Sequence, residues 1–262
     1  MSFEANRVLP GITHIRDCMG VCMTLIEGEK AALLVDTGYG VENVADFIRT
    51  LTDKPLTVIL THHHHDHTLG VRWFDEVFML PADKAEWAVF NGQEKRRAVF
   101  QQAIAKGLPI TEAEFLAGEC PQPRDLSTGC FDLGGLTLMI MACPGHTPGS
   151  CVVYIPERRL LLTGDDWNPC TWLFFEAALP VQEYRENVRR LQALEFDHVL
   201  CSHQPELYPR SKFDDFVNRL SDDVLGAAQP VTIGGYEHIA TRQANVTQGQ
   251  ILVFDWNKAK QS

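Results

Sequence analysis

The sequence predicts a fold of the α/β class, in which strands and helices alternate along the chain. Short apolar segments rich in β-branched residues recur between segments whose apolar residues repeat at helical spacing. Stretches rich in Gly and Pro separate many of these segments, as turns would. The chain of 262 residues, 45% of them hydrophobic, is long enough to bury a substantial core between such elements.

The first half of the chain is expected to contain three strands and a helical insertion. Residues 20–38 read as two strands joined by a turn at residues 27–30, and residues 41–51 have the spacing of a helix. Residues 56–60 form a short apolar strand that ends at a histidine cluster. Residues 83–119 are predicted to be helical and amphipathic.

The second half of the chain returns to strands. Three apolar segments are predicted to be strands, at residues 136–142, 151–155 and 160–163. A helix is expected over residues 181–194 and a strand over residues 198–203. Residues 211–257 are expected to contain a helix and then a hairpin around Gln248 and Gly249. Because no linker or repeat interrupts the pattern, residues 1–262 are predicted to form a single domain.

The composition indicates which partners the protein can bind and in which cellular compartment we expect it. A net charge of −11 disfavours a nucleic-acid partner, because such a chain repels phosphate. The nearest approach to a basic run, Lys95 to Arg97, is interpreted as an exposed helix surface. No segment has the pattern of a secretory signal or the length of a bilayer span, and the eight cysteines are scattered. We therefore expect a cytoplasmic protein with reduced thiols and no membrane partner.

Imidazoles and carboxylates follow the ends of the apolar strands. Asp36 and the histidine cluster of residues 62–67 each follow a strand in the first half of the chain. His146, Asp165 and His203 each follow a strand in the second half. If these strands lie side by side, five imidazoles and two carboxylates meet at one edge, which is costly without a compensating cation. The pattern therefore indicates a metal centre.

The run THHHHDHTLG permits more than one register of metal ligands. His63 and His67 are four apart, as in a helical HExxH site, but His64 stands where that site needs Glu. His63, His65 and His67 alternate as three ligands on one strand face would, and this register gives Asp66 no role. The register HxHxDH is preferred, with His62, His64, Asp66 and His67 as ligands.

These motifs together resemble those of the metallo-β-lactamase superfamily, whose hallmark is HxHxDH after a strand. Later family motifs are matched by His146 in PGHTPGS, Asp165 in TGDD and His203 at a late strand end. Asp36 in VDTG matches the first motif of the family, which is structural rather than ligating. The resemblance covers about residues 11–205 and is strongest to the glyoxalase II-like branch. It implies one domain with a four-layered αβ/βα sandwich, two sheets face to face and helices outside.

The resemblance also implies two divalent metal ions per chain and assigns their ligands. These would be His62, His64 and His146 for one ion, Asp66, His67 and His203 for the other, and Asp165 for both. The mixed imidazole and carboxylate set suits Zn²⁺ best, and Fe or Mn also tolerate it. His63 and His65 are left as bystanders, either exposed or behind the ligands. Asp166 stands where the family usually has a small or hydroxyl residue.

For the reaction, the resemblance implies that a metal-bridging hydroxide attacks a carbonyl or phosphoryl centre. Asp66 is expected to be the catalytic residue that orients the nucleophile and passes a proton to the leaving group. True β-lactamases of the superfamily lack a bridging Asp at the place of Asp165, which favours thioesterases, lactonases and phosphodiesterases. The leading prediction is a binuclear hydrolase of an ester, thioester or lactone of a small, partly apolar substrate. A phosphodiesterase or a mononuclear iron persulfide dioxygenase is the alternative.

Aromatic residues after Asp165 are candidates for binding this small-molecule substrate. The candidates for the apolar wall are Trp167, Trp172, Phe174 and Phe175, and those for polar contacts are Tyr184 and Tyr236. The alternative is that the aromatic residues pack under a lid or in the contact of a homodimer. The helical insertion, through Trp87 and Phe90, is expected to supply the lid.

Overall fold

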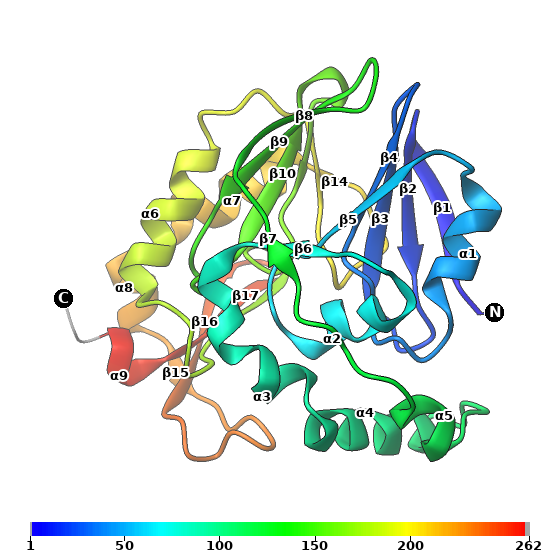
Figure 1. Cartoon of the computed structure of the whole chain (residues 1–262). Coiled ribbons are helices and arrows are strands. Elements are labelled where there is room, and N and C mark those ends of the chain that lie inside the picture. The colour runs from blue at the N-terminus through cyan, green and yellow to red at the C-terminus, as the bar shows by residue number, and fades with distance from the viewer. Residues whose placement is uncertain (1, 260–262) are drawn as a thin grey trace.

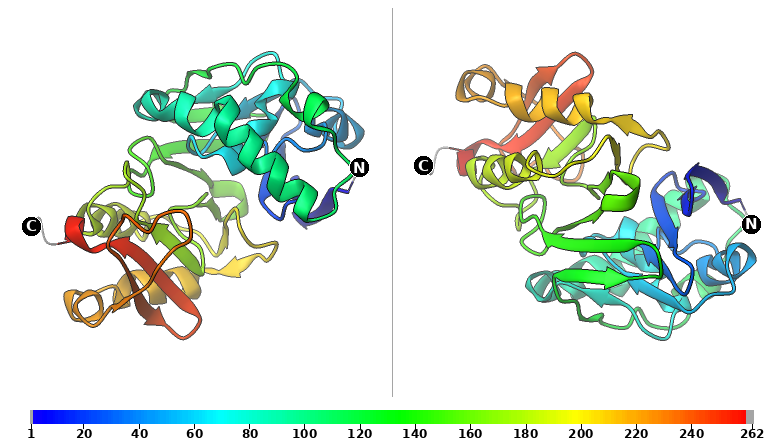
Figure 2. Two further views of the ribbon diagram at one scale, coloured as in Figure 1. Left: turned by 90° about the horizontal axis from the view of Figure 1, so that it is seen from below. Right: turned by 90° about the horizontal axis from the view of Figure 1, so that it is seen from above.

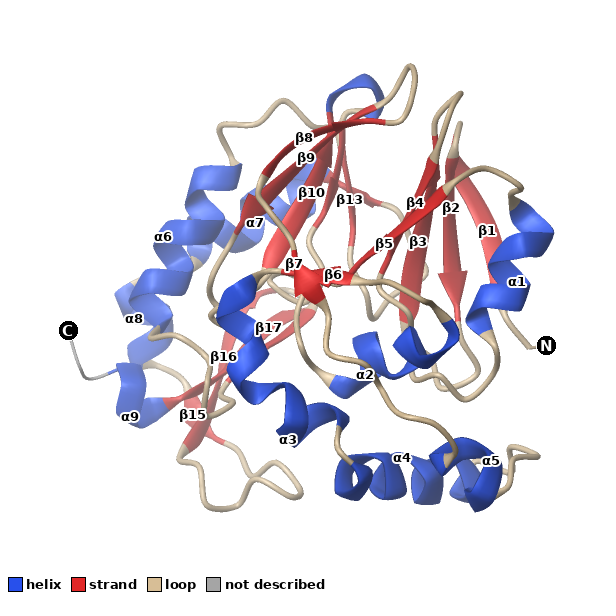
Figure 3. Cartoon of the chain, viewed as in Figure 1, coloured by secondary structure: helices blue, strands red, loops and turns tan. Residues whose placement is uncertain are grey.

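The computed structural model describes residues 2–259, so residue 1 and residues 260–262 of the predicted domain lie outside this range. Two mixed sheets face one another, and helices cover their outer sides (Figures 1 and 3). This arrangement confirms the predicted αβ/βα sandwich of the α/β class. Across residues 2–259, no helix is both long and apolar enough to cross a lipid bilayer.

The first sheet has the strand order β1-β2-β3-β4-β5-β6-β7. Its strands are β1 (Glu4–Leu9), β2 (Ile12–Arg16), β3 (Cys22–Glu27), β4 (Ala32–Val35), β5 (Leu56–Ile59), β6 (Phe78–Met79) and β7 (Arg124–Asp125). The strands from β1 to β4 are antiparallel, whereas those from β4 to β7 are parallel. All four residues of β4 are buried, because both faces of this strand are covered.

The second sheet has the strand order β14-β13-β11-β10-β9-β8. Its strands are β8 (Gly129–Asp132), β9 (Thr137–Ala142), β10 (Cys151–Ile155), β11 (Leu160–Leu162), β13 (His198–Leu200) and β14 (Tyr208–Pro209). Apolar side chains from the two sheets meet in one core cluster, which includes Leu33, Ile59, Ile140, Val153 and Leu162. The short 3-10 turn η3 (Pro156–Arg158) joins β10 to β11.

Helices pack on the outer face of each sheet. Helix α1 (Val44–Leu51) buries Val44 and Ile48 against the first sheet. Helices α6 (Val181–Leu191) and α7 (Arg210–Arg219) cover the second sheet, and α8 (Asp222–Gly226) follows α7. From α7, Phe213 and Phe216 are fully buried, and each such side chain contributes about 1.5–3 kcal/mol of burial free energy.

A third sheet lies beyond the second one and was not anticipated as a separate sheet. It has the order β12-β17-β16-β15, with β12 (Cys170–Leu173), β15 (Gln229–Pro230), β16 (Thr241–Thr247) and β17 (Gln250–Asp255). The hairpin predicted around Gln248 and Gly249 is present as β16 and β17, and helix α9 (Trp256–Ala259) follows it. Figure 2 shows this hairpin, in red, on the far side of the second sheet from the N-terminal strands.

The segment of residues 83–119 is helical, as predicted. It contains η2 (Pro81–Glu86), α3 (Trp87–Asn91), α4 (Gln93–Ala105) and α5 (Glu112–Leu116). Trp87 is in the core of the first sheet and so is not part of a lid. Arg96 is buried rather than exposed, because its guanidinium donates to the carbonyls of Phe115, Ala117 and Gly118 at the end of α5. Arg96 thereby fixes α4 to α5.

Candidate metal centre

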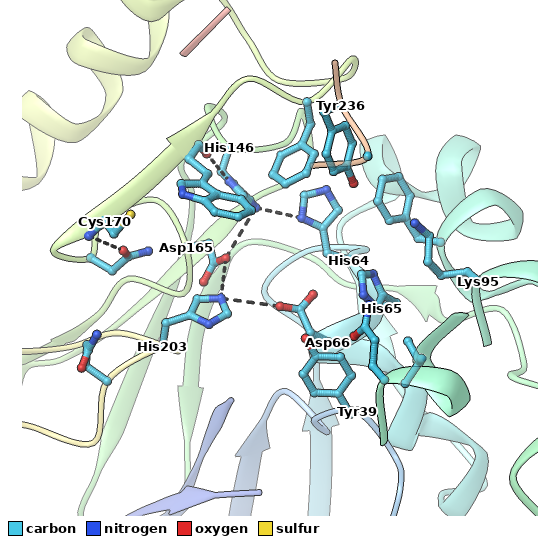
Figure 4. Close-up of a pocket in the computed structure, with 18 residues that line it drawn as sticks. Tyr39, His64, His65, Asp66, Lys95, His146, Asp165, Cys170, His203 and Tyr236 are labelled. Carbon is cyan, nitrogen blue, oxygen red and sulfur yellow. Dashed lines mark hydrogen bonds and ion pairs between the residues drawn. The ribbon is translucent and has the colours of Figure 1, made fainter. Parts of the chain in front are cut away.

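The predicted ligands come together at one end of the two central sheets. The histidine run leaves β5 and continues into α2 (His65–Thr68) and η1 (Leu69–Trp73). His146 lies in the loop between β9 and β10, whereas Asp165 and His203 follow β11 and β13, which are parallel neighbours. Figure 4 shows His64, Asp66, His146, Asp165 and His203 directed toward one another.

The seven side chains fall into two groups. The first group is His62, His64 and His146; the second is Asp66, His67, Asp165 and His203. Within each group, the ring nitrogens and carboxylate oxygens lie within 4.8 Å of one another. These are the two sets that the family resemblance implies, with Asp165 placed in the second set.

In the first group, two imidazoles are oriented by acceptors on their Nδ1 side. Nδ1 of His146 donates to the carbonyl of Trp172 at 2.6 Å, and Nδ1 of His62 is 3.0 Å from Oγ1 of Thr61. The Nε2 atom of each ring is therefore on the side away from these acceptors, and Nε2 of His62 has no hydrogen-bond partner. Nε2 of His146 lies 2.9 Å from Nδ1 of His64, so two ring nitrogens point at one place.

In the second group, His67 is oriented by Asp36. Nδ1 of His67 lies 3.0 Å from Oδ2 of Asp36, which leaves Nε2 toward the group. That Nε2 has no hydrogen-bond partner and is 3.4 Å from Asp66 Oδ2 and 3.5 Å from Asp165 Oδ2. Nε2 of His203 is 2.9 Å from Asp165 Oδ2 and 3.5 Å from Asp66 Oδ2.

Asp165 lies within reach of both groups. Its Oδ2 is 3.6 Å from Nε2 of His146 in the first group and 2.9 Å from Nε2 of His203 in the second. Its Oδ1 is buried and has no hydrogen-bond partner. Buried nitrogens and oxygens without partners are costly, and a cation at their centre would satisfy them. The donor set therefore fits bound Zn²⁺, Fe or Mn ions.

The electrostatics keep the ligands of the first group unprotonated. Burial lowers the pKa of His62 and of His64 well below the usual value, and neighbouring imidazoles lower both further. Burial also lowers the pKa of His146, although Asp165 opposes this effect. Neutral imidazoles are the forms that bind metal ions.

In the second group, opposite charges change the pKa values more than burial does. Burial alone would lower the pKa of His67, but Asp66, Asp165 and Asp36 raise it well above the usual value. Burial would raise the pKa of Asp165, but His203 and His67 hold it well below the usual range. His67 lowers the pKa of Asp66 in the same way, although Asp66 is buried. Both carboxylates are therefore ionised.

Asp36 has the structural role that the resemblance implies. Its Oδ1 accepts from the backbone N–H of Thr61 at 2.7 Å, and both of its oxygens are within 3.0 Å of the Thr61 hydroxyl. Because that hydroxyl donates to Asp36, it accepts from Nδ1 of His62. Asp36 has a φ of 65°, a left-handed conformation that costs energy outside glycine. It thus orients one imidazole in each group.

His63 is buried behind the first group, which agrees with the second of its two expected placements. Its Nδ1 lies 3.1 Å from Oδ2 of Asp83, which also accepts from the His63 N–H. Asp83, fully buried, accepts in addition from the Thr147 hydroxyl at 2.8 Å and the Gly149 N–H at 2.5 Å. This carboxylate therefore holds together the loops that carry His64 and His146. Sequence reasoning missed it, because a single Asp inside a helical segment carries no motif.

Asp166 and Tyr184 position the His146 loop. Oδ1 of Asp166 accepts from the N–H of His146, and the Tyr184 hydroxyl donates to the Asp166 carbonyl at 2.6 Å. Burial raises the pKa of Asp166 well above the usual value, and Asp165 raises it further. Tyr184 is fully buried and does not line the pocket, so its predicted substrate contact is wrong.

A cavity of about 620 Å³ opens above the candidate metal centre. Five of the proposed ligands reach it, namely His64, Asp66, His146, Asp165 and His203. Five aromatic residues line its walls, namely Tyr39, Phe90, Trp172, Phe175 and Tyr236. Three of these were predicted as substrate contacts, and Phe90 comes from the helical segment that was predicted to form a lid.

Trp167 and Phe174 do not line this cavity, so the structure contradicts them as substrate contacts. Both are fully buried: Trp167 packs edge-on against Phe213, and Phe174 stacks behind Phe175. Side chains of β12 alternate between its faces, which places Cys170 and Trp172 in the cavity and the next residues in the core.

His65 and Lys95 also line the cavity. His65 is half-buried, with its ring edge-on to Tyr39 at 5.7 Å between centroids. Burial lowers the pKa of His65, Asp66 raises it and Lys95 lowers it. Lys95 therefore lies close to the cavity wall, and the interpretation of its segment as a plain exposed helix surface is wrong.

Comparison with known proteins identifies the family to which the chain is related. A family model of the metallo-beta-lactamase superfamily matches residues 16–203. Acyl-coenzyme A thioesterase MBLAC2 from Gallus gallus is 27% identical over 187 residues, which are 65% of this chain and 66% of that protein. The chain thus spans just under two thirds of that relative's length. A hydroxyacylglutathione hydrolase from Cronobacter sakazakii is 27% identical over 223 residues, or 76% of this chain and 86% of that protein.

The structural comparison agrees on the fold. A beta-lactamase domain protein from Burkholderia ambifaria superposes with a TM-score of 0.62 at 19% identity, over 96% of this chain and 93% of that one. The family match contains the complete HxHxDH motif and extends to His203. The chain therefore belongs to the metallo-beta-lactamase superfamily.

Proposed function

We propose that this protein is a binuclear hydrolase that cleaves an ester, thioester or lactone of a small, partly apolar substrate. One observation carries the proposal: Oδ2 of Asp165 lies within 3.6 Å of ring nitrogens from both ligand groups, at the floor of an aromatic-lined cavity. A carboxylate within reach of both groups can bridge a pair of adjacent metal ions.

The proposed ligands are His62, His64 and His146 for one ion, and Asp66, His67 and His203 for the other, with Asp165 common to both. When bound, the two ions supply the Lewis acidity that lowers the pKa of a water molecule and polarises a carbonyl group. Zn²⁺ is the proposed identity of both ions because of the imidazole-rich set, with Fe or Mn as the alternatives.

Asp66 is the proposed catalytic residue among these ligands. Its Oδ2 is held 3.4 Å from His67 and 3.5 Å from His203, and its side chain reaches the cavity. In hydrolysis, the oxygen of water bonds to the acyl carbon, and the bond from that carbon to sulfur or oxygen breaks. Asp66 is placed to accept the proton of the attacking water and to pass it to the departing thiolate or alkoxide.

Within this reaction class we propose a thioester as the first substrate to test. Two relatives named above are a thioesterase and a hydroxyacylglutathione hydrolase, which supports this order. The aromatic residues Phe90, Trp172, Phe175 and Tyr236 support an apolar portion on the substrate. The cytoplasmic location and the homodimer remain predictions.

The test is a hydrolysis panel on protein of measured metal content, with thioesters, lactones, phosphodiesters and β-lactams. We expect two metal ions per chain and turnover of thioesters or lactones that His64→Ala abolishes. Turnover that survives His64→Ala would contradict the proposal. One iron per chain with oxygen uptake would instead identify a persulfide dioxygenase.

A further inference from the structure

Among residues 2–259, the cavity is lined by one basic side chain of the lysine or arginine type. Within the described part of the chain, Lys95 is that residue, and the other polar groups of the wall opposite the metal ligands are neutral or imidazole. Lys95, Val99 and Gln102 all line the cavity, as residues spaced four and seven positions apart on one face of α4 do. The face of α4 that carries Lys95 is therefore turned toward the cavity.

Lys95 is held in this position by its neighbours. The adjacent Arg96 ties α4 to α5 through three carbonyls, and Val99 on the same face is fully buried. Nζ of Lys95 lies 5.5 Å from the ring centroid of Phe90, which also lines the cavity. The helix that carries this charge is therefore anchored at the cavity wall.

The charge of Lys95 contacts the Phe90 ring but has no carboxylate partner in the described residues. Lys95 is half-buried, and no carboxylate lies within ion-pair distance of its Nζ in residues 2–259. By contrast, Arg97 on the same helix is exposed and lies 3.8 Å from Glu112. A half-buried cation without a counter-ion loses solvation, and an anionic ligand would restore the balance. Because the chain has a net charge of −11, it repels anions, and a local cation in the cavity would offset this repulsion for an anionic substrate.

We propose that Lys95 binds an anionic group, a carboxylate or a phosphate, on the part of the substrate remote from the bond that is cleaved. In this proposal the scissile group lies over Asp66 and Asp165, and the substrate body lies along Phe90, Phe175 and Tyr236, which line the cavity. The preferred substrates are accordingly anionic esters or thioesters. This inference rests on the proposed function, because it concerns the other end of the substrate that is cleaved at the metal centre.

The test compares three thioesters with the same acyl group. Their thiols are N-acetylcysteamine, which is neutral, 3-mercaptopropionate, which carries a carboxylate, and 2-mercaptoethyl phosphate. We expect Lys95→Met to lower the ratio of kcat/KM for an anionic thioester to that for the neutral one about tenfold, mainly through KM. Lys95→Arg should keep the ratio, and Lys95→Glu should invert the preference.

Arg97→Met is the matched control, since it removes one positive charge from the same helix outside the cavity. We expect it to leave all three kcat/KM values unchanged. An equal effect of Arg97→Met and Lys95→Met would mean long-range steering and would overturn the inference. The more strongly affected of the two anionic thioesters identifies the anion.

A binding measurement gives a readout that needs no turnover. The probes are thioethers of the same three thiols, in which a methylene group replaces the carbonyl. We expect calorimetry to show that Lys95→Met weakens both anionic thioethers about tenfold, in metal-free and metal-loaded protein alike. Equal affinity for neutral and anionic probes in the unmodified protein overturns this inference while the proposed function stands. Absence of turnover on every thioester and lactone would overturn the proposed function and this inference together.

Discussion

The two ligand groups of the candidate metal centre differ in charge and in exposure. The first group consists of three imidazoles that are at most 4% exposed. The second contains two carboxylates, and the side chains of His203 and Asp66 are 37% and 15% exposed. The two carboxylates of the second group would neutralise the charge of a bound cation. A cation in the first group would be held by well-oriented neutral imidazoles.

The difference extends to the groups behind the ligands. In the first group, Nδ1 of His146 donates to a backbone carbonyl and Nδ1 of His62 to a hydroxyl. In the second, Nδ1 of His67 faces the carboxylate of Asp36. Asp36 also accepts from the Thr61 hydroxyl, so it supports both groups at once. The two groups are thus unlike in composition but share Asp36 behind them and Asp165 in front.

The largest effect should come from Asp165→Ala, which removes the carboxylate that both groups reach. We expect less than one metal ion to remain per chain and kcat/KM to fall by about three orders of magnitude, since Lewis acidity supplies several kcal/mol. Mass spectrometry of bound metal, together with the hydrolysis assay, measures both. Loss of one ion with the other fully retained would mean that Asp165 serves a single group.

Asp66→Asn tests whether Asp66 of the second group transfers the proton from the attacking water to the leaving group. We expect kcat to fall by about two orders of magnitude or more, because Asn cannot accept and release a proton. The hydrolysis assay is run on samples whose metal content has been determined, so that loss of the ion is recognised. Turnover within about twofold of the unmodified enzyme would remove Asp66 from the proton pathway.

Asp36→Asn should weaken both groups, because it disturbs His67 directly and His62 through Thr61. We expect metal affinity to fall by about 10- to 100-fold at both sites. Competition with a chelator of known affinity measures this loss. If only one site weakens, the support from Asp36 is not shared, and the two groups are more independent than the hydrogen bonds indicate.

Asp83→Asn separates support of the loops from binding of the metal. Three groups donate hydrogen bonds to this buried carboxylate, so we expect the free energy of unfolding to fall by about 1.5–3 kcal/mol. Urea denaturation of the metal-free protein measures it, with the exposed Asp53→Asn as control. Equal stability of the two variants would show that Asp83 does not hold the loops together.

The smallest effects should distinguish the two histidines between the ligands. His63 is buried against Asp83 and Phe90, so His63→Gln should lower the free energy of unfolding by about 1 kcal/mol. His65 is half-buried at the cavity, so His65→Gln should change it by less than about 0.5 kcal/mol. The same denaturation experiment measures both, and the reverse order would contradict these placements.

The chemistry of the ligand set could be predicted because it is local. HxHxDH directly follows a short apolar strand, and His146, Asp165 and His203 follow other strands. Neighbouring parallel strands end at the same edge of a sheet, so the strand-end positions indicated a metal centre, and the family resemblance implied its individual ligands. The α/β class and the C-terminal hairpin were predictable for the same reason, since periodicity and turn residues act over a few positions.

The cavity walls, in contrast, depended on contacts between distant segments. Trp167, Trp172 and Phe174 look alike in sequence, yet only Trp172 faces the cavity, because pairing of β12 with β17 sets which face is covered. Lys95 and Asp83 carry no local signal. One is turned inward by the packing of α4, and the other is buried by two loops that are remote along the chain. The sequence by itself determined which groups could bind metal ions, whereas the tertiary structure alone decided what surrounds them, because burial and charge pairing are properties of neighbours in space.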